Sequence, residues 1–198
     1  MSEESFRAAS ERPLSRGGFS ANHAASRAGF GLEDLPLQDA HPGVVIASPS
    51  LDEVNELYEI RITLEPLATE IATAQLSDAE LAGLERILAQ MRDADPTRFV
   101  ELNREFHSRI YPAAKRPRLS ELAEALSKSA AGYVRMNIDR YDPAYRGDAH
   151  AEHEAILGAM RSHAPRWAAR AMQIHLEHSA RHMTGLIEKT RGPAPGGG

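Results

Sequence analysis

The 198-residue sequence predicts an all-α fold, an antiparallel bundle of about six helices that follows a disordered N-terminal arm. Apolar residues recur at helical spacing from residue 51 to about residue 190. Patterns that start helices interrupt this region repeatedly, and no β-rich block separates them. The chain therefore divides into an arm at 1–43, a helical domain at 44–190 and a disordered tail at 191–198.

The N-terminal arm carries no helical or strand pattern. Residues 1–43 are rich in Ser, Gly, Ala and Pro, a composition typical of disorder, and residues 43–48 (GVVIAS) form a short β-prone run. Residues 1–50 contain four arginines, no lysine and six acidic residues, a net charge of −2. A DNA-binding head should be basic, because phosphate neutralisation supplies most of its affinity. We therefore do not expect this chain alone to bind DNA specifically.

The first three helices are predicted from stripes and start signals. The first runs from 51 to about 76, and Pro66 is expected to kink it or to mark a restart. The sequence SDAE at 77–80 is a capping box that opens the second helix, and DP at 95–96 starts the third, which runs to about 114. The expected stripes are Leu57, Ile60, Leu64, Leu67 and Ile71 on the first helix, and Leu81, Leu84, Leu88 and Met91 on the second.

The last three helices follow from similar signals. The segment RPRLSELAEAL begins a fourth helix that lasts to about 140. Asp142 and Pro143 start a fifth, which contains HAEHEAILGAM, and HAPRW breaks the chain before a sixth at 165–190.

The overall composition limits the class of protein. The net charge is −5 with neutral histidines, which gives no electrostatic signature of nucleic acid or membrane-surface binding. The absence of cysteine excludes disulfides and thiolate metal sites. The start of the chain lacks the apolar core of a signal peptide, and no apolar run approaches the ~18 residues of a membrane span. We expect a cytoplasmic protein that does not enter a membrane.

Three predicted helices each direct a histidine along an apolar stripe. These are His107, His153 and His175, and Asn103 lies one turn before His107. Burying such groups unpaired costs roughly 1–3 kcal/mol each. Each histidine taken alone is better explained as a core residue bonded to a nearby carbonyl or hydroxyl. Taken together, three imidazoles and an oxygen donor favour a divalent ion such as Zn²⁺, Ni²⁺ or Mn²⁺. His150 and His178 form HxxH pairs with His153 and His175 and are alternates.

Four segments together resemble the effector-binding C-terminal (FCD) domain of GntR-type transcription regulators of the FadR-like branch. They are LDEVNELYEIRITLEPLATEIA at 51–72, NREFHSRI at 103–110, EHEAIL at 152–157 and AMQIHLEH at 171–178. The resemblance spans about residues 44–190. It implies an all-helical, dimeric sensing domain with a metal in a central cavity. Members of this family carry a winged helix-turn-helix ahead of this domain, and no recognition-helix pattern is found before residue 44.

The resemblance also implies particular site residues. The metal-ligand pattern of the family falls on Asn103, His107, His153 and His175, and it departs from the family at Asn103, where the usual residue is Asp. The metal would hold the carboxylate of a small organic acid. Arg61 matches a position that reaches the effector, and its guanidinium suits a carboxylate. An ion pair between Arg61 and Glu65 is an equal alternative, while Arg135 and Lys128 are weaker candidates for effector binding.

Three functions are therefore in competition. The first is a metabolite-responsive sensing domain that works as a homodimer and reaches DNA only if a winged-helix head is supplied. The second is a truncated dimerisation partner of an intact regulator. The third is a metal-dependent hydrolase, which we do not favour because no general base accompanies the histidines: Glu105, Glu152 and Glu154 all diverge from the nearest histidine along their helices.

Overall fold

The computed structural model describes residues 49–138 and 142–191, and every regular element in these two ranges is helical. The predicted arm at 1–43, the β-prone run at 43–48 and the predicted tail beyond residue 191 lie outside the described residues. The elements are α1 (Leu51–Thr73), α2 (Asp78–Arg92), α3 (Pro96–Ile110), the 3₁₀ turn η3 (Tyr111–Ala114), α4 (Pro117–Met136), α5 (Pro143–Arg161) and α6 (Pro165–Arg191). The predicted six-helix, all-α fold is confirmed.

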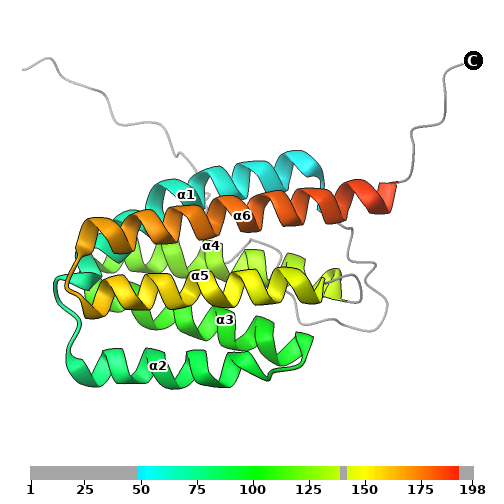
Figure 1. Cartoon of the computed structure of the whole chain (residues 1–198). Helices are drawn as coiled ribbons and strands as arrows, with labels where there is room; N and C mark the ends of the chain where they lie inside the picture. Colours follow the sequence, from blue (N-terminus) through cyan, green and yellow to red (C-terminus); the bar gives the residue numbers. More distant parts are fainter. Residues whose placement is uncertain (1–48, 139–141, 192–198) are drawn as a thin grey trace, which may run out of the picture. The chain divides into compact units, whose positions relative to one another are not determined.

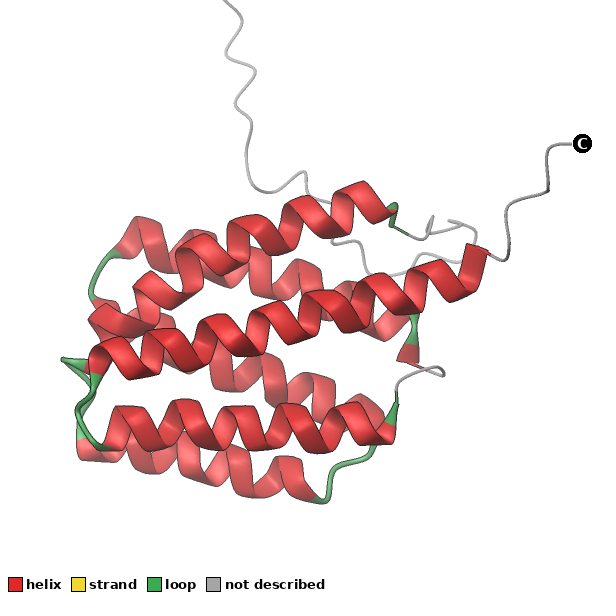
Figure 2. Cartoon of the chain, turned by 45° about the horizontal axis from the view of Figure 1, so that its top comes forward, coloured by secondary structure: helices red, strands yellow, loops and turns green. Residues whose placement is uncertain are grey.

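The helices form a bundle in which distant segments of the chain are neighbours. The first and last helices, α1 and α6, pack along each other, and α5 lies beside α6 (Figures 1 and 2). Helix α2 packs on α3 and α5, and α4 packs on α1 and α3. The arrangement brings α3, α5 and α6, which carry the three histidines, around one interior. None of the helices in the described ranges combines the length and apolarity needed to cross a bilayer.

Four helices begin with side-chain caps. Ser50 and Glu53 form a capping box at α1, and Ser77 and Glu80 form the predicted one at α2. Asp95 caps α3 ahead of Pro96, and Asp142 caps α5 ahead of Pro143, as the DP dipeptides predict. Each such cap satisfies backbone N–H groups that the helix itself leaves free and contributes about 1 kcal/mol.

The apolar stripe predicted for the first helix is wrong. Leu57 is buried, but Ile60 and Leu67 are 40% and 48% exposed. The buried face of α1 instead includes charged and hydroxyl side chains, among them Arg61 and Glu65. Polar residues therefore share the buried face of α1 with apolar ones, and two large apolar residues lie on the surface. Helix α1 thus contributes both to a polar interior site and to an apolar outer face.

Other boundaries differ by a few residues from the sequence prediction. Pro66 lies inside a continuous α1 and does not restart it. The third helix ends at Ile110, where η3 takes over, and Lys115 in a left-handed conformation (φ 51°) closes that turn. Helix α4 ends at Met136 rather than near 140. The stripe predicted for the second helix is buried throughout.

Candidate metal centre

Three histidines from three helices meet inside the bundle. His107 of α3, His153 of α5 and His175 of α6 are no more than 2% exposed. The Nε2 atom of His107 lies 3.3 Å from the Nε2 atoms of both His153 and His175. Ligand nitrogens around a tetrahedral Zn²⁺, with Zn–N bonds of about 2.0–2.1 Å, lie about 3.3–3.4 Å apart. These two separations match that spacing, and one ligand atom from each of the three histidines lies within 4.8 Å of the other two.

The opposite nitrogen of each ring has its own partner. Nδ1 of His153 lies 2.6 Å from the carbonyl oxygen of Ala149, and Nδ1 of His175 lies 2.9 Å from Oε2 of Glu152. Because these oxygens only accept, Nδ1 of each ring carries the proton, and the lone pair resides on Nε2. Metal-bound histidines show this pattern, since a partner on Nδ1 fixes the tautomer and the ring orientation.

The partner of His107 belongs to a buried chain of hydrogen bonds. The Tyr111 hydroxyl donates to Oε2 of Glu65 at 2.5 Å, which leaves its oxygen free to accept from Nδ1 of His107 at 3.2 Å. Arg61 donates through Nε to Oε1 of Glu65 at 2.6 Å. Both charged residues are almost fully buried, at 4% and 0% exposure. These hydrogen bonds therefore give His107 the same tautomer as the other two histidines.

The interior keeps two of the histidines, His107 and His153, neutral. Burial, with smaller contributions from His175, His153 and Arg61, holds the pKa of His107 well below its ordinary value. Burial also lowers the pKa of His153, again with help from His175. His107 and His153 are thus neutral, and the Nε2 lone pairs of the cluster point at one another, an arrangement that is repulsive unless a cation lies between them. Neutral imidazole is also the form that binds metal.

Burial and neighbouring charges together set the pKa values of the supporting residues. Burial and the Glu65 carboxylate raise the pKa of Tyr111 well above its ordinary value, so its hydroxyl stays protonated. Burial lowers the pKa of Arg61, but Glu65 together with Tyr58 and Tyr111 outweighs it and the net pKa is raised. Burial raises the pKa of Glu152, yet its bonds to His175 and His178 hold it below the usual value. Arg61 and Glu152 are therefore charged at neutral pH.

Asn103 lies one turn before His107 on α3 and is partly buried. It lines a cavity of about 20 Å³ together with Arg61 of α1 and His175 of α6. Tyr58, Ser127, Tyr145 and Ser179 add to the wall of this cavity. A volume of that size holds about one water molecule. Of the four residues expected at the metal, Asn103 and His175 line this cavity, whereas His107 and His153 do not.

The predicted effector residues separate into two groups. Arg61 lines the cavity and also forms the predicted alternative, an ion pair with Glu65. Arg135 and Lys128 are exposed on α4 and do not line this cavity, so the prediction that Arg135 reaches the effector is not supported by its position. These two residues share a face of α4, but that face is turned toward solvent.

Sequence reasoning missed three residues that orient the histidines: Glu65, Tyr111 and Glu152. The sequence indicates Glu65 only as a partner of Arg61, and Glu152 diverges from His153 along its helix. In the structure Glu152 bonds instead to His175 and His178 of the neighbouring helix. The i, i+4 spacing of His107 and Tyr111 is the one local signal that indicated part of this arrangement.

Comparisons with known proteins agree with the fold. Residues 56–178 match the family model described as the FCD domain. An uncharacterised HTH-type transcriptional regulator, YdhC of Bacillus subtilis, is 26% identical over 167 residues, which cover 79% of this chain and 71% of that protein.

Three solved structures share the fold. A GntR protein of Streptococcus agalactiae is 26% identical with a TM-score of 0.55, over 65% of this chain and 58% of that one. A GntR family member from Pseudomonas syringae is 23% identical with a TM-score of 0.64, over 76% and 64%. McbR/YncC of E. coli is 20% identical with a TM-score of 0.60, over 70% and 66%. The chain spans less than two thirds of each of these solved proteins.

Proposed function

Because this chain belongs to the FCD domain family, an effector-binding regulatory domain, we propose that it senses a small organic acid at a metal ion on behalf of a GntR/FadR-type transcription regulator. The observation that supports this most directly is the convergence of three Nε2 lone pairs whose rings are each fixed through Nδ1. The regulator would act in the cytoplasm, and DNA contact would require a winged-helix head.

The donor set fits a borderline divalent ion. His107, His153 and His175 would hold Zn²⁺, Ni²⁺ or Mn²⁺ through Nε2, and Asn103 would add an amide oxygen. When bound, the ion supplies a fixed positive charge that attracts a carboxylate. Arg61 borders the same cavity, and Glu65 engages its Nε and Nη2 atoms but not its Nη1. We propose that Arg61 contributes Nη1 to the acid.

A thermal-shift experiment tests this function. We expect small mono- and dicarboxylates to raise the melting temperature of the metal-loaded chain, because a ligand that binds only the folded state stabilises it, by about 2.7 kcal/mol at a hundred times its Kd. The same acids should have no effect on protein treated with a chelator. Equal shifts with and without metal, or protein that retains no metal when purified without chelator, would contradict the proposal.

The hydrolase alternative lacks a base. The two carboxylates nearest the histidines are both engaged, Glu65 by Arg61 and Tyr111 and Glu152 by His175 and His178. A carboxylate that orients a ligand histidine is not free to activate water. The named relatives are transcription regulators, and none is described as an enzyme. A sensing role is thus the better explanation of the site.

An exposed apolar face supports a homodimer. Ile60, Leu64 and Leu67 recur at helical spacing on α1, and the first and last are 40% and 48% exposed. Helix α4, which packs against α1, adds Leu122 at 39% exposure. Contiguous exposed apolar residues mark interaction sites in soluble proteins. We propose that a second copy covers this face. If this chain is instead a truncated partner of an intact regulator, that regulator would bind the same face.

A charge on this face should separate the copies. We expect Leu67→Glu to convert a dimer into a monomer of about half the mass in light scattering, because an unpaired carboxylate buried at an interface costs several kcal/mol. Ile174→Glu is the matched control, since Ile174 is an equally exposed apolar residue (43%) on α6 and should leave the mass unchanged. A monomeric unmodified chain, or a dimer that persists in Leu67→Glu, would refute this interface.

A further inference from the structure

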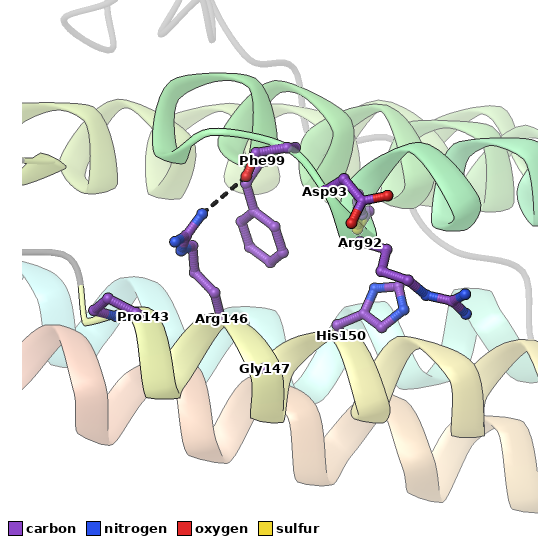
Figure 3. A pocket seen from close by; sticks show the side chains of 9 residues that line it. Arg92, Asp93, Phe99, Pro143, Arg146, Gly147 and His150 are labelled. Atoms are coloured by element: carbon purple, nitrogen blue, oxygen red, sulfur yellow. Dashed lines mark hydrogen bonds between the residues drawn. The ribbon is translucent and has the colours of Figure 1, made fainter.

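A second and larger pocket lies apart from the three histidines. It has a volume of about 370 Å³ and is formed where the end of α2 and the segment after it face the first half of α5. Figure 3 shows Arg146 and His150 both pointing from α5 toward that segment, with the ring of Phe99 between them. Pockets of roughly 300–1,000 Å³ are the size that holds small molecules.

Arg146 brings a positive charge into this pocket without a carboxylate partner. Its Nη1 donates to the carbonyl oxygen of Ala94 at 2.9 Å, the hydrogen bond drawn in Figure 3. Its Nε is buried and has no hydrogen-bond partner. Within residues 49–138 and 142–191, no acidic side chain lies within 4.0 Å of its guanidinium. A buried donor without an acceptor destabilises the fold, so an anion at this point would be stabilising.

His150 faces the same space and also lacks hydrogen bonds. Its side chain is 14% exposed, and both ring nitrogens are buried without a hydrogen-bond partner. The nearest acidic atom is Oε1 of Glu154, which lies 3.4 Å from Nε2 and the same distance from Nη2 of Arg92. Either neutral tautomer of His150 keeps one N–H available. The ring can therefore donate to a ligand beside Arg146.

The rest of the lining restricts the chemical class of that ligand. Met91 and Phe99, which are 1% and 2% exposed, provide an apolar wall. Arg92 is paired with Glu154, and Asp93 adds a negative charge to the lining, so the pocket has little excess positive charge for a polyanion. A single carboxylate attached to an apolar body matches both the donors and the wall.

We propose that this pocket binds a small amphipathic monocarboxylate, with its carboxylate between Arg146 and His150 and its apolar body on Phe99 and Met91. The site is independent of the metal centre. Its helices are nevertheless those of the metal ligands, since His150 precedes His153 by three residues on α5 and Phe99 precedes Asn103 by four on α3. An acid bound here would contact both helices.

Benzoate is a suitable probe, and its binding to the full 198-residue chain can be followed by saturation-transfer NMR and calorimetry in the presence of a chelator. The chelator removes any contribution from a metal-bound carboxylate. We expect benzoate to bind and neutral benzamide to bind at least about tenfold more weakly, because charge-assisted hydrogen bonds contribute about 1.5–3 kcal/mol. Equal binding of the two, or no benzoate binding, would overturn the proposal.

Variants locate the site. Arg146→Gln removes the charge, although its amide can still donate to Ala94, and this variant should weaken benzoate binding about tenfold or more. Arg146→Lys keeps the charge and should retain most of the benzoate binding. Arg118→Gln, at a fully exposed surface arginine, and His175→Ala, at the metal centre, should bind benzoate as the unmodified chain does. Loss of binding in His175→Ala, or unchanged binding in Arg146→Gln, would refute this site.

Discussion

His175→Ala is expected to reduce metal affinity by more than about a hundredfold, since even the loss of an outer-shell partner costs about 10–100-fold and His175 is a direct ligand in the proposed site. Two imidazoles and an amide oxygen would remain, which is too few donors to hold Zn²⁺ tightly. Metal content after dialysis and competition with a chromogenic chelator measure the effect. Circular dichroism confirms that the variant is folded.

Two further variants give this prediction its controls. His178→Ala removes a histidine from the same helix that also bonds to Glu152 but lies outside the cluster, so metal affinity should stay within about tenfold. Asn103→Asp adds a formal negative charge beside His107 and should tighten binding by about tenfold, or about 1.4 kcal/mol. If all three variants bind metal as the unmodified chain does, the histidine cluster is not a metal site.

Glu65→Ala should lower the free energy of unfolding by about 3–5 kcal/mol, because it leaves the guanidinium of Arg61 charged and unpaired inside the bundle. The Tyr111 hydroxyl also loses its acceptor, which adds to the cost. For a folded region of this size the melting temperature should fall by about 10 °C or more. Urea denaturation measures the free energy directly.

The chain offers a closely matched control for Glu65. Arg109 and Glu105 form an ion pair at the same i, i+4 spacing, with exposures of 55% and 38%. Glu105→Ala should change the free energy of unfolding by less than about 1 kcal/mol, because exposed ion pairs contribute little. The double variant Arg61→Leu/Glu65→Leu should recover part of the stability that Glu65→Ala loses. Its metal affinity should be lower than that of the unmodified chain. Equal costs for Glu65→Ala and Glu105→Ala would show that burial of the pair has no effect.

The number of helices and their start points follow from local signals. Serine and aspartate caps with a glutamate or proline close behind identify where α1, α2, α3 and α5 begin, because the cap chemistry is contained within four residues. The ends were less accurate. The change from α3 to η3 and the end of α4 depend on how the chain packs against neighbouring helices, which no local pattern records.

The sequence predicted the convergence of the histidines better than their surroundings. An imidazole on an otherwise apolar helix face indicates an interior polar site, whichever neighbouring helix that face packs against. The buried face of α1 could not be predicted in this way, because both of its faces carry apolar residues. The face with Ile60, Leu64 and Leu67 has the more regular pattern. Glu65 and Tyr111 meet only after α1 and η3 pack together. Contacts of that kind follow from tertiary structure and not from spacing.

The cavity beside His175 holds about one water molecule, and its walls come from α1, α3, α4, α5 and α6. An organic acid is larger than that, so under the proposed function it can enter only if these helices move apart. Two of them, α1 and α4, also carry the exposed apolar face. Effector entry would then reshape the surface on which the two copies meet. Binding of the effector in the interior would in this way change the orientation of one subunit relative to the other.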